Sequence, residues 1–460
     1  MLGLLMQGVK PSTEAYTVML VYFVQGVLGL ASLARTFYFK DQLGLPPAEQ
    51  AALMGITTLP WLLKPLYGFL SDGLPLFGYR RKSYLALAGL LGSLSWLSLA
   101  TVVHSVPQAI FASTTASLGV AISDVVVDSL VVERARDDAS SGSGALQSLS
   151  WSCQSLGALT SAYFSGSLLE TLTPQQVFAL TAFFPLLVVA TSITLPEKRV
   201  ESSRGSAEFR TLLRDQTSLL WSAARDRRVW LPALFLCAWQ ATPSCDTAYF
   251  YFLSNELTIG PEFLGRVRIV TSLASLLGIA VYRRFLSDVP VKKVLFWCSL
   301  VSAPLGLTQL LLVYGLNRQL GIPDGLFTLG DSLILTVLGQ LAFMPLLVLA
   351  ASICPPGVEG TLFATLMSLF NGAGVVGAEL GAALTSMLGV TENNFDNLGL
   401  LVAICNSSSI LPLLVIDWLD VAVEGTGGER VQLTVRGEEE REQARVEDIW
   451  RGIGGDNFDD

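Results

Sequence analysis

Two short runs decide the fold of this chain: Gly68-Phe69-Leu70-Ser71-Asp72, followed by Gly78-Tyr79-Arg80-Arg81-Lys82, and Phe285-Leu286-Ser287-Asp288, followed by Lys292 and Lys293. Each run joins two apolar stretches that are long enough to cross a bilayer. A glycine lets two helices approach closely, and an aspartate near a helix end can bind basic side chains or a helix N-terminus. Because the run occurs twice, we expect two related halves that rock about a cytoplasmic hinge, as in a transporter. The predicted hinge residues are Gly68, Asp72, Gly78, Arg80, Arg81, Lys82 and Asp288.

The composition is that of a membrane protein. Hydrophobic residues make up 51% of the 460 residues, charged residues only 15%, and the mean hydropathy is +0.54. A helix needs about 20 apolar residues to cross about 30 Å of hydrocarbon, and backbone groups in lipid must be satisfied within the helix. The predicted fold is therefore all-α, with twelve transmembrane helices at residues 16–39, 50–70, 83–103, 107–132, 144–169, 176–195, 230–253, 263–286, 294–315, 331–353, 360–389 and 395–417.

The distribution of Lys and Arg between the loops predicts the orientation in the membrane. With the N-terminus inside, the cytoplasmic loops hold most of the basic residues, including residues 80–82, 198–228 and 292–293. Both termini are therefore expected in the cytoplasm, with the chain in the plasma membrane of a bacterium. The predicted domains are a six-helix bundle at 1–195, a cytoplasmic linker at 196–229, a second six-helix bundle at 230–419 and an acidic, disordered tail at 420–460.

The sequence shows no sign of enzyme chemistry. The six cysteines lie singly in or beside apolar stretches, without CxxC spacing or histidine partners. They therefore predict neither a metal site nor disulfides. Hydrolase, phosphate-loop and zinc motifs are not found either, so we expect no cofactor and no enzyme activity.

Charged residues inside the predicted spans are the strongest functional signal. Each costs at least about 2.5 kcal/mol at a helix centre and rarely persists without a purpose. Asp124 and Asp128 are four positions apart, so both carboxylates share one face of their helix. Arg266 and Arg268 are two positions apart, about 200° around a helix, so both cannot face one cavity. The candidate residues are Lys64, Asp124, Asp128, Asp246, Arg266, Arg268 and Glu379.

Structural roles remain open for two of the basic residues. Arg266 lies close to a helix end, where pairing with Glu262 or extension of its side chain to the membrane surface would explain it. Lys64 could pair with Asp128 or with Asp72 and so hold two helices together.

The acidic residues have similar alternatives. Asp128 could belong with Glu133 and Arg134 to a cytoplasmic gate, which leaves Asp124 as the better candidate for a central cavity. Glu379 lies between two glycines and could face either a neighbouring helix or the cavity.

Several motifs occur together along the chain: Phe37 to Asp41, Lys64 to Gly68, Ser71 to Gly73, Gly78 to Lys82, Ser123 to Asp128, Gly265 to Arg268, Asp288 to Pro290 and Glu359 to Ala364. Together they resemble the folate-biopterin transporter family of the major facilitator superfamily. Residues 73–77 separate the aspartate from the basic cluster, as in this family, whereas the cluster lies closer to the aspartate in the superfamily at large. The resemblance covers residues 16–419 and, without a transit peptide, looks like that of a cyanobacterial member.

The resemblance implies a carrier of folates or related pterins that is coupled to protons. The 2-amino group and N3–H of a pterin form a pair of donors that a carboxylate of Asp124, Asp128 or Asp246 could accept. The anionic glutamate end of a folate suits Lys64 or one of Arg266 and Arg268. Charge-assisted contacts of this kind are worth about 1.5 to 3 kcal/mol.

Aromatic and amide side chains complete this expected site. Trp61, Trp151 and Tyr249 could stack on the pterin ring, and Gln154 is a weaker candidate because most amides inside spans hydrogen-bond between helices. Protonation removes the charge of a buried carboxylate, so Asp124 or Glu379 could carry the coupling proton.

The expected partners are therefore an anionic folate or pterin, protons and the lipid bilayer, with no nucleic acid, and the chain is expected to act as a monomer. Two alternatives remain. One is a facilitator carrier for another amphipathic solute, which an uptake competition panel would reveal. The other is a membrane factor that delivers or scaffolds pigments, which would co-purify with chlorophyll proteins and carry no solute.

Overall fold

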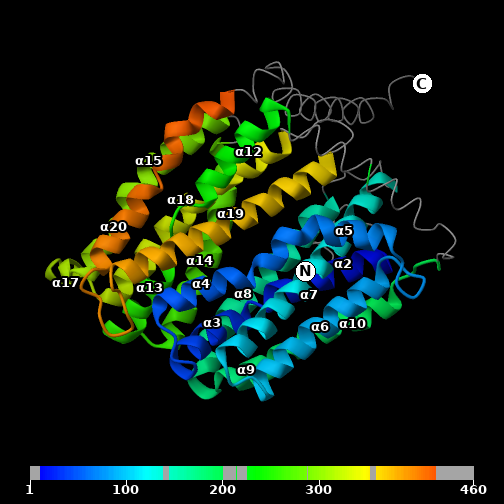
Figure 1. Ribbon diagram of the computed structural model, residues 1–460, viewed down its shortest axis with the longest axis horizontal. Helices are drawn as coiled ribbons and strands as arrows, with labels where there is room; N and C mark the ends of the chain where they lie inside the picture. Colours follow the sequence, from blue (N-terminus) through cyan, green and yellow to red (C-terminus); the bar gives the residue numbers. More distant parts are fainter. Residues whose placement is uncertain are drawn as a thin grey trace, which may run out of the picture.

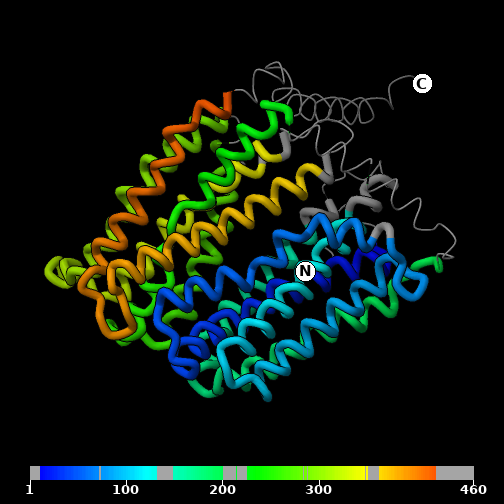
Figure 2. Tube along the Cα trace, viewed as in Figure 1, coloured from blue at the N-terminus to red at the C-terminus, as the bar shows by residue number. Residues whose placement is uncertain are grey.

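The computed structural model describes residues 11–137, 145–199, 214, 225–286, 289–352 and 359–420. The named elements in these residues are all helical, and they lie side by side in two groups (Figure 1). The chain passes through the first group, coloured blue to blue-green, before it enters the second, coloured green to orange (Figure 2). The all-α prediction is confirmed.

The first group contains the elements up to residue 194. They are α2 (Thr13–Val27), α3 (Leu30–Phe37), η1 (Tyr38–Gln42), α4 (Pro47–Thr57), η2 (Leu59–Leu63), α5 (Lys64–Gly73), α6 (Lys82–Thr101), α7 (Val106–Asp137), α8 (Ala145–Thr171), α9 (Pro174–Thr181) and α10 (Phe183–Thr194). Here η1 is a π-helical turn and η2 a 3-10 turn.

The second group contains the elements from residue 227 onward. They are α12 (Arg227–Gln240), α13 (Asp246–Tyr251), η3 (Phe252–Glu256), α14 (Pro261–Val281), η4 (Tyr282–Leu286), α15 (Val291–Gly306), α16 (Gln309–Val313), α17 (Leu316–Gln319), α18 (Asp324–Ser352), α19 (Glu359–Met387), α20 (Leu398–Ser408) and η5 (Leu411–Leu419). The predicted domain boundaries stay a prediction. Most of the predicted linker and nearly all of the predicted tail lie outside the described residues.

Within the described residues, nine helical stretches are long and apolar enough to cross a membrane, and they coincide with nine of the predicted spans. The other three predicted spans contain breaks or many polar residues. The span at 50–70 is divided by η2, the span at 230–253 is interrupted between α12 and α13, and the span at 144–169 is the serine-rich α8. Polar residues lower the hydropathy of these helices, so the count of twelve stays a prediction.

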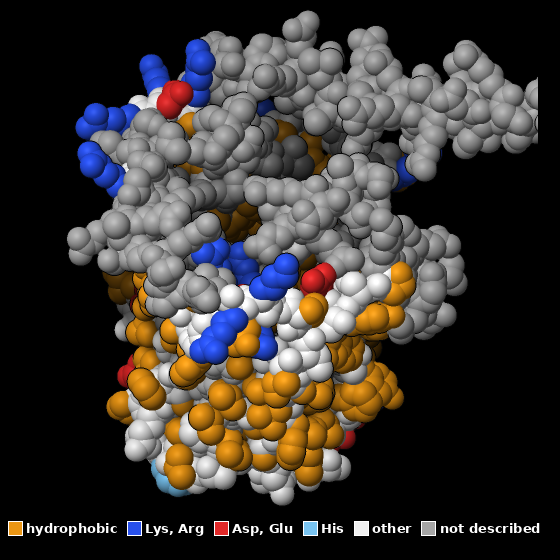
Figure 3. All heavy atoms as spheres, turned by 90° about the vertical axis from the view of Figure 1, so that its right-hand side faces the viewer, with side chains coloured by type: hydrophobic (Ala, Val, Ile, Leu, Met, Phe, Trp, Pro, Cys, Tyr) orange, Lys and Arg blue, Asp and Glu red, His pale blue; other side chains and the backbone are white. Residues whose placement is uncertain are grey.

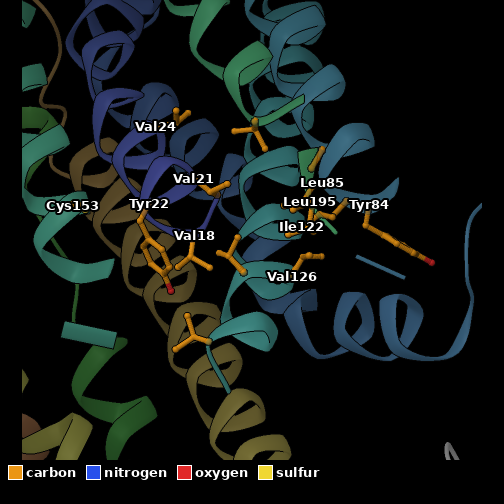
Figure 4. Close-up of a cluster of buried hydrophobic side chains, with 14 of the residues drawn as sticks. Val18, Val21, Tyr22, Val24, Tyr84, Leu85, Ile122, Val126, Cys153 and Leu195 are labelled. Carbon is orange, nitrogen blue, oxygen red and sulfur yellow. The ribbon is translucent and has the colours of Figure 1, made fainter. Parts of the chain in front are cut away.

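Close helix contacts in the first group depend on small side chains. A Cβ on Gly157 of α8 would lie 3.0 Å from the backbone nitrogen of Val27, so α8 and α2 pack backbone to backbone. Beside this contact, Val18, Val21 and Tyr22 of α2 join a buried cluster with Leu85 and Val126 (Figure 4). The cluster fixes the position of α2 against α6 and α7.

In both groups, acidic residues near the end of the last helix bind the start of an earlier helix. The earlier helix is α6 in the first group and α15 in the second. The Glu197 carboxylate, just after α10, accepts from the backbone N–H groups of Arg80 at 2.6 Å, Arg81 at 3.0 Å and Lys82 at 2.9 Å, where α6 begins. Lys292, at the start of α15, binds the two acidic residues at the end of η5, Asp417 at 2.7 Å and Asp420 at 2.6 Å. We call this end of the molecule the basic end. Lys and Arg side chains gather there, next to a flank covered by hydrophobic side chains (Figure 3).

Glu197→Gln is expected to destabilise the protein by about 1 kcal/mol, because a carboxylate at a helix N-terminus satisfies backbone donors and interacts favourably with the helix dipole. Thermal unfolding in detergent measures this as a lower melting temperature. Glu170→Gln is the matched control, since Glu170 is exposed near the C-terminal end of α8, where a negative charge is not favoured. Equal melting temperatures for the two variants would contradict the capping role of Glu197.

The opposite end of the molecule closes through two turns with the same hydrogen-bond pattern. In η1, the N–H of Leu43 donates to the carbonyl of Tyr38 at 3.0 Å, and in η3 the N–H of Leu257 donates to Phe252 at 3.1 Å. The residue after each of these leucines has a positive φ: Gly44 at +65° and Thr258 at +51°. Because threonine rarely adopts this conformation, its presence here indicates that the second turn is held by its surroundings.

Aromatic residues from the two groups meet at this end, which we call the sealed end. The Tyr251 hydroxyl donates to the carbonyl of Leu45 at 2.5 Å, with Oε1 of Gln50 as a second acceptor at 2.6 Å. The rings of Phe37 and Phe250 pack edge to face with centroids 5.4 Å apart. Tyr251 is fully buried, so these contacts exclude water between the two groups at the sealed end.

Candidate functional site

A buried ion pair lies near the middle of the first group. The break at η2 places Lys64 at the start of α5, beside α7, where its ammonium binds the carboxylate of Asp124. Their side chains are 18% and 10% exposed. The Lys64 ammonium also lies 5.0 Å from the ring centroid of Trp61, whose Nε1 donates to Ser117. A buried ion pair is costly to desolvate, and the folded protein is strongly destabilised if one partner loses its charge.

The predicted pairing of Lys64 with Asp128 needs correction. The structure pairs Lys64 with Asp124, because Asp128, one turn further along α7, accepts a hydrogen bond from the Tyr22 hydroxyl instead. The side chain of Asp72 lies outside the described residues. Asp124 and Asp128 are close enough for their charges to interact, as expected for carboxylates four positions apart. Lys64 of α5 and Tyr22 of α2 thus bind two carboxylates on a single face of α7.

The two arginines of α14 point in different directions, as their spacing predicts. Arg266 is 61% exposed and pairs with Glu262, which is one of the two structural alternatives predicted for this residue. Arg268 is half-buried, and its Nη2 would lie 3.5 Å from a Cβ on Gly29, at the junction of α2 and α3. Arg268 is therefore the arginine that faces the other group of helices.

Glu379 faces a neighbouring helix. A Cβ on Gly55 of α4 would lie 3.3 Å from Oε1 of Glu379, so the carboxylate stands at the contact between α4 and α19. The flanking Gly377 and Gly381 serve another purpose, because they pack against the backbone of residues 240–244, where α12 and α13 are interrupted. Glycines four positions apart and a glutamate between them necessarily lie on opposite sides of α19.

The remaining candidates lie further from this cluster. Asp246 is exposed at the first position of α13, directly after the interruption. Trp151 is 55% exposed on α8, whereas Gln154 is half-buried on the part of α8 that packs against α2. Tyr249 is half-buried, and its hydroxyl has no hydrogen-bond partner among the described residues.

The hinge residues of the first half lie at the basic end. A Cβ on Gly68 would lie 3.6 Å from Val125 of α7, so a larger residue would press on α7. Gly78 has φ +84° and would bring a Cβ within 2.8 Å of the Arg199 side chain, so this position requires glycine. Arg81 donates to Ser71 at 3.2 Å. Asp288 and the Glu133 and Arg134 side chains of the predicted gate lie outside the described residues.

Three polar residues that are buried or half-buried were not among the predicted site residues. The Tyr22 hydroxyl donates to Asp128, and the Thr308 hydroxyl donates to Asp331 of α18 at 2.7 Å. Arg35 lies on α3, two residues before Phe37 of the sealed end. Within the described part of the chain, no group of three or more His, Cys, Asp or Glu side chains is arranged to hold a metal ion.

Tyr251→Phe is expected to weaken the sealed end, because the carbonyl of Leu45 and the amide of Gln50 would then lose a buried donor. The loss is worth about 1 to 3 kcal/mol and should shift the protein away from the state described here. Spectroscopic distances between probes on α3 and α13 measure the shift. Tyr38→Phe is the matched control, because Tyr38 donates at 2.8 Å to Val103 of its own group. The two variants should lose similar stability, but only Tyr251→Phe should separate the probes.

Comparison with known proteins agrees with this arrangement. The family model described as "BT1 family" matches residues 25–426. The chain belongs to the BT1 family. It is 52% identical over 406 residues to a protein of Synechocystis sp. named folate-biopterin transporter, covering 88% of this chain and 81% of that relative. It is also 32% identical over 408 residues to folate transporter 2 of Plasmodium falciparum, covering 87% and 88% of the two chains.

Solved structures show the fold that this BT1 family member adopts. The nucleoside transporter NupG superposes with a TM-score of 0.66 at 15% identity, covering 89% of this chain and 98% of that one. A D-xylose-proton symporter superposes with a TM-score of 0.63 at 16% identity, covering 87% and 97%. The chain thus has the major facilitator fold. Its family, its apolar helices and its named relatives make it a multi-pass membrane transporter of a small molecule. Its named relatives are transporters rather than enzymes.

Proposed function

We propose that this protein carries folates and related pterins across a membrane by alternating access and that transport is coupled to protons. The observation that carries the proposal is the 52% identity to a relative named folate-biopterin transporter. The ionisable cluster on α5 and α7 supports it, because a charged, ring-bearing solute needs both charge and an aromatic face. Lys64, Asp124 and Trp61 offer both in one place.

The proposed binding mode places the pterin ring beside Trp61, with the carboxylate of Asp124 or Asp128 accepting from its 2-amino group and N3–H. The anionic end of a folate then lies toward a basic side chain, and Arg268 is the arginine of α14 that faces inward. Asp246, Trp151 and Gln154 remain proposals as substrate contacts. Asp246 and Trp151 are exposed, whereas Gln154 is half-buried. Asp246 also lies beside an interrupted helix, where substrate sites of carriers often lie.

Proton coupling would act through the ion pair. Protonation of Asp124 removes its charge and releases Lys64, so binding of a proton changes both the net charge and the geometry of the site. Glu379 is the second proposed proton carrier. It lies where α4 of the first group contacts α19 of the second, so movement of one group against the other would change the surroundings of its carboxylate.

Alternating access would come from rocking of the two six-helix bundles proposed at residues 1–195 and 230–419. The aromatic contacts of the sealed end, Tyr251 with Leu45 and Phe37 with Phe250, would open while the basic end closes. We further propose that the basic end and both termini face the cytoplasm, that the membrane is the bacterial plasma membrane and that the monomer is the working unit. The last point fits a fold in which the two halves of one chain enclose the site.

A competition panel tests the substrate class. Cells that express the protein should take up labelled folic acid, and unlabelled folate, 5-formylfolate and biopterin should compete, whereas xylose and nucleosides should not. Competition by a nucleoside or sugar, with none from a pterin, would replace the folate proposal by a carrier for another solute. Co-purification with chlorophyll proteins and no solute flux would favour a pigment-delivery factor.

A further inference from the structure

Two guanidinium groups lack partners where the two groups of helices meet. Arg35 comes from α3 and Arg268 from α14. Within the described residues, neither side chain donates a hydrogen bond or pairs with a carboxylate, and Nε of Arg35 is buried without any partner. An arginine that only supports the fold normally finds a carboxylate or carbonyl.

The two arginines lie near each other. Nη2 of Arg268 would lie 3.5 Å from a Cβ on Gly29, and Arg35 follows on the same segment, less than two turns closer to the sealed end. Their charges are close enough to repel each other. The position of Arg268 is fixed by close packing, because Gly265, one turn earlier on α14, contacts the backbone of Gly166 on α8. The pair therefore bridges the two halves of the chain.

Five other basic residues of the described part contrast with this pair, because each has an acidic partner. Lys40 pairs with Asp41, Lys64 with Asp124, Arg266 with Glu262, Lys292 with Asp417 and Asp420, and Arg318 with Asp324. Two repelling cations in a low-dielectric setting are unfavourable unless an anion joins them. The arrangement therefore carries an excess of positive charge that a ligand can neutralise.

We infer that Arg35 and Arg268 form an anion site that takes a dicarboxylate end of the transported solute, such as the glutamate end of a folate. Two guanidinium groups match two carboxylates in charge, and each can bind one through two parallel hydrogen bonds. The inference rests on the proposed function and deepens it. It places the glutamate end of the folate on the side of the site nearer the sealed end. The pterin ring would then lie beside the ion pair of Lys64 and Asp124, whose net charge is zero. The inference also adds Arg35 as a specificity-determining residue.

Because one arginine comes from each half, the anion would hold the two halves together at this point. Binding of a dicarboxylate would thus favour the state in which the sealed end stays closed, whereas a pterin without carboxylates would leave the arginines apart. The site therefore predicts that the two substrate types depend differently on the same residues.

The test compares uptake of folic acid and biopterin by the full chain in liposomes. We expect Arg35→Gln and Arg268→Gln each to lower folate uptake about 10-fold to 100-fold, because each removes a charge-assisted contact. Biopterin lacks the glutamate end, so its uptake should stay within about twofold of the wild type. Arg266→Gln is the matched control, being two positions from Arg268 but exposed and paired with Glu262, and should change neither rate.

Thermal unfolding separates binding from structural support. Loss of one of two repelling cations should leave the melting temperature without ligand unchanged or raise it, and should abolish the rise that folic acid causes in the wild type. Arg35→Lys and Arg268→Lys keep the charge and should retain part of the folate uptake. Folate uptake at the wild-type rate in both Gln variants would overturn the inference, as would equal loss of folate and biopterin uptake, or a lower melting temperature without ligand.

Failure of the inference can be told apart from failure of the proposed function. A wild-type protein that carries biopterin but not folate overturns the anion site while transport of pterins stands. A wild-type protein that carries neither overturns the proposed function itself, and the inference with it.

Discussion

Lys64→Ala is expected to abolish uptake of folic acid and biopterin. The substitution leaves the carboxylate of Asp124, whose side chain is only 10% exposed, without its partner. Breaking a buried pair by removing one partner costs about 3 to 5 kcal/mol, and the partial exposure of both side chains places the expected loss at the lower end. It also removes the cation beside Trp61. Initial uptake rates in liposomes, at equal amounts of folded protein, measure the loss.

The double variant Lys64→Ala/Asp124→Ala separates stability from function. Removal of both charges should recover most of the melting temperature lost in Lys64→Ala, because no unpaired charge remains. Uptake should remain absent, since the groups proposed to bind substrate and proton are gone. Lys293→Ala is the matched control, because Lys293 is exposed near the start of α15 and should tolerate alanine. Uptake near the wild-type rate in the double variant would exclude the pair from the transport site.

Gly265→Leu is expected to give the largest structural effect. A Cβ at this position would lie 2.7 Å from Cα of Gly166, so α14 and α8 would have to move apart. Backbone cannot rotate away as a side chain can, and overpacking of this kind costs about 1 to 3 kcal/mol or more. The contact joins the two halves of the chain, so we also expect uptake to be lost in any protein that still folds. The yield of monodisperse protein and its uptake rate measure both effects.

Gly330→Leu is the matched control for this substitution. Gly330 lies in α18, is exposed, and would have no atom within 4 Å of an added Cβ. Leucine has a higher helix propensity than glycine and suits a lipid-facing position, so yield and uptake should be unchanged. Equal loss in both variants would mean that leucine is harmful anywhere in these helices and that the contact with Gly166 has no special role.

The sequence predicted the helical class and the approximate positions of the spans, because apolar stretches of this length have one stable solution in lipid. It did not predict the interruptions. The 3-10 turn at η2 and the gap between α12 and α13 depend on packing against α19, where Gly377 and Gly381 approach the backbone. Contacts between segments more than a hundred residues apart leave no periodic signal in the sequence.

The candidate site was predicted residue by residue but not as pairs. Charge inside a span identified Lys64 and Asp124, but their pairing depends on how two helices are rotated, so the predicted pairing with Asp128 was wrong. Tyr22 carries no charge and stands among apolar residues, so nothing distinguished it. Asp331 was placed at the first position of its predicted span, whereas α18 begins at Asp324 and buries it two turns inside. Helix boundaries are the least reliable part of such predictions.

Arg35 carries the same signal in the sequence as the predicted site residues. It is a charged residue within the first predicted span, as Lys64 and Arg268 are within theirs. Its significance comes from the structure, which places Arg268 from the other half of the chain beside Gly29, less than two turns from Arg35.

Uptake by the purified protein in liposomes shows directly whether this chain carries folates and pterins. Labelled folic acid and biopterin are presented to vesicles that hold the protein, with and without an imposed pH gradient, and empty vesicles measure leakage. We expect uptake of both solutes above the empty-vesicle rate, faster uptake with the gradient, and loss of that uptake in Lys64→Ala. Uptake equal to that of empty vesicles for both solutes, by protein that is folded and correctly inserted, would contradict it.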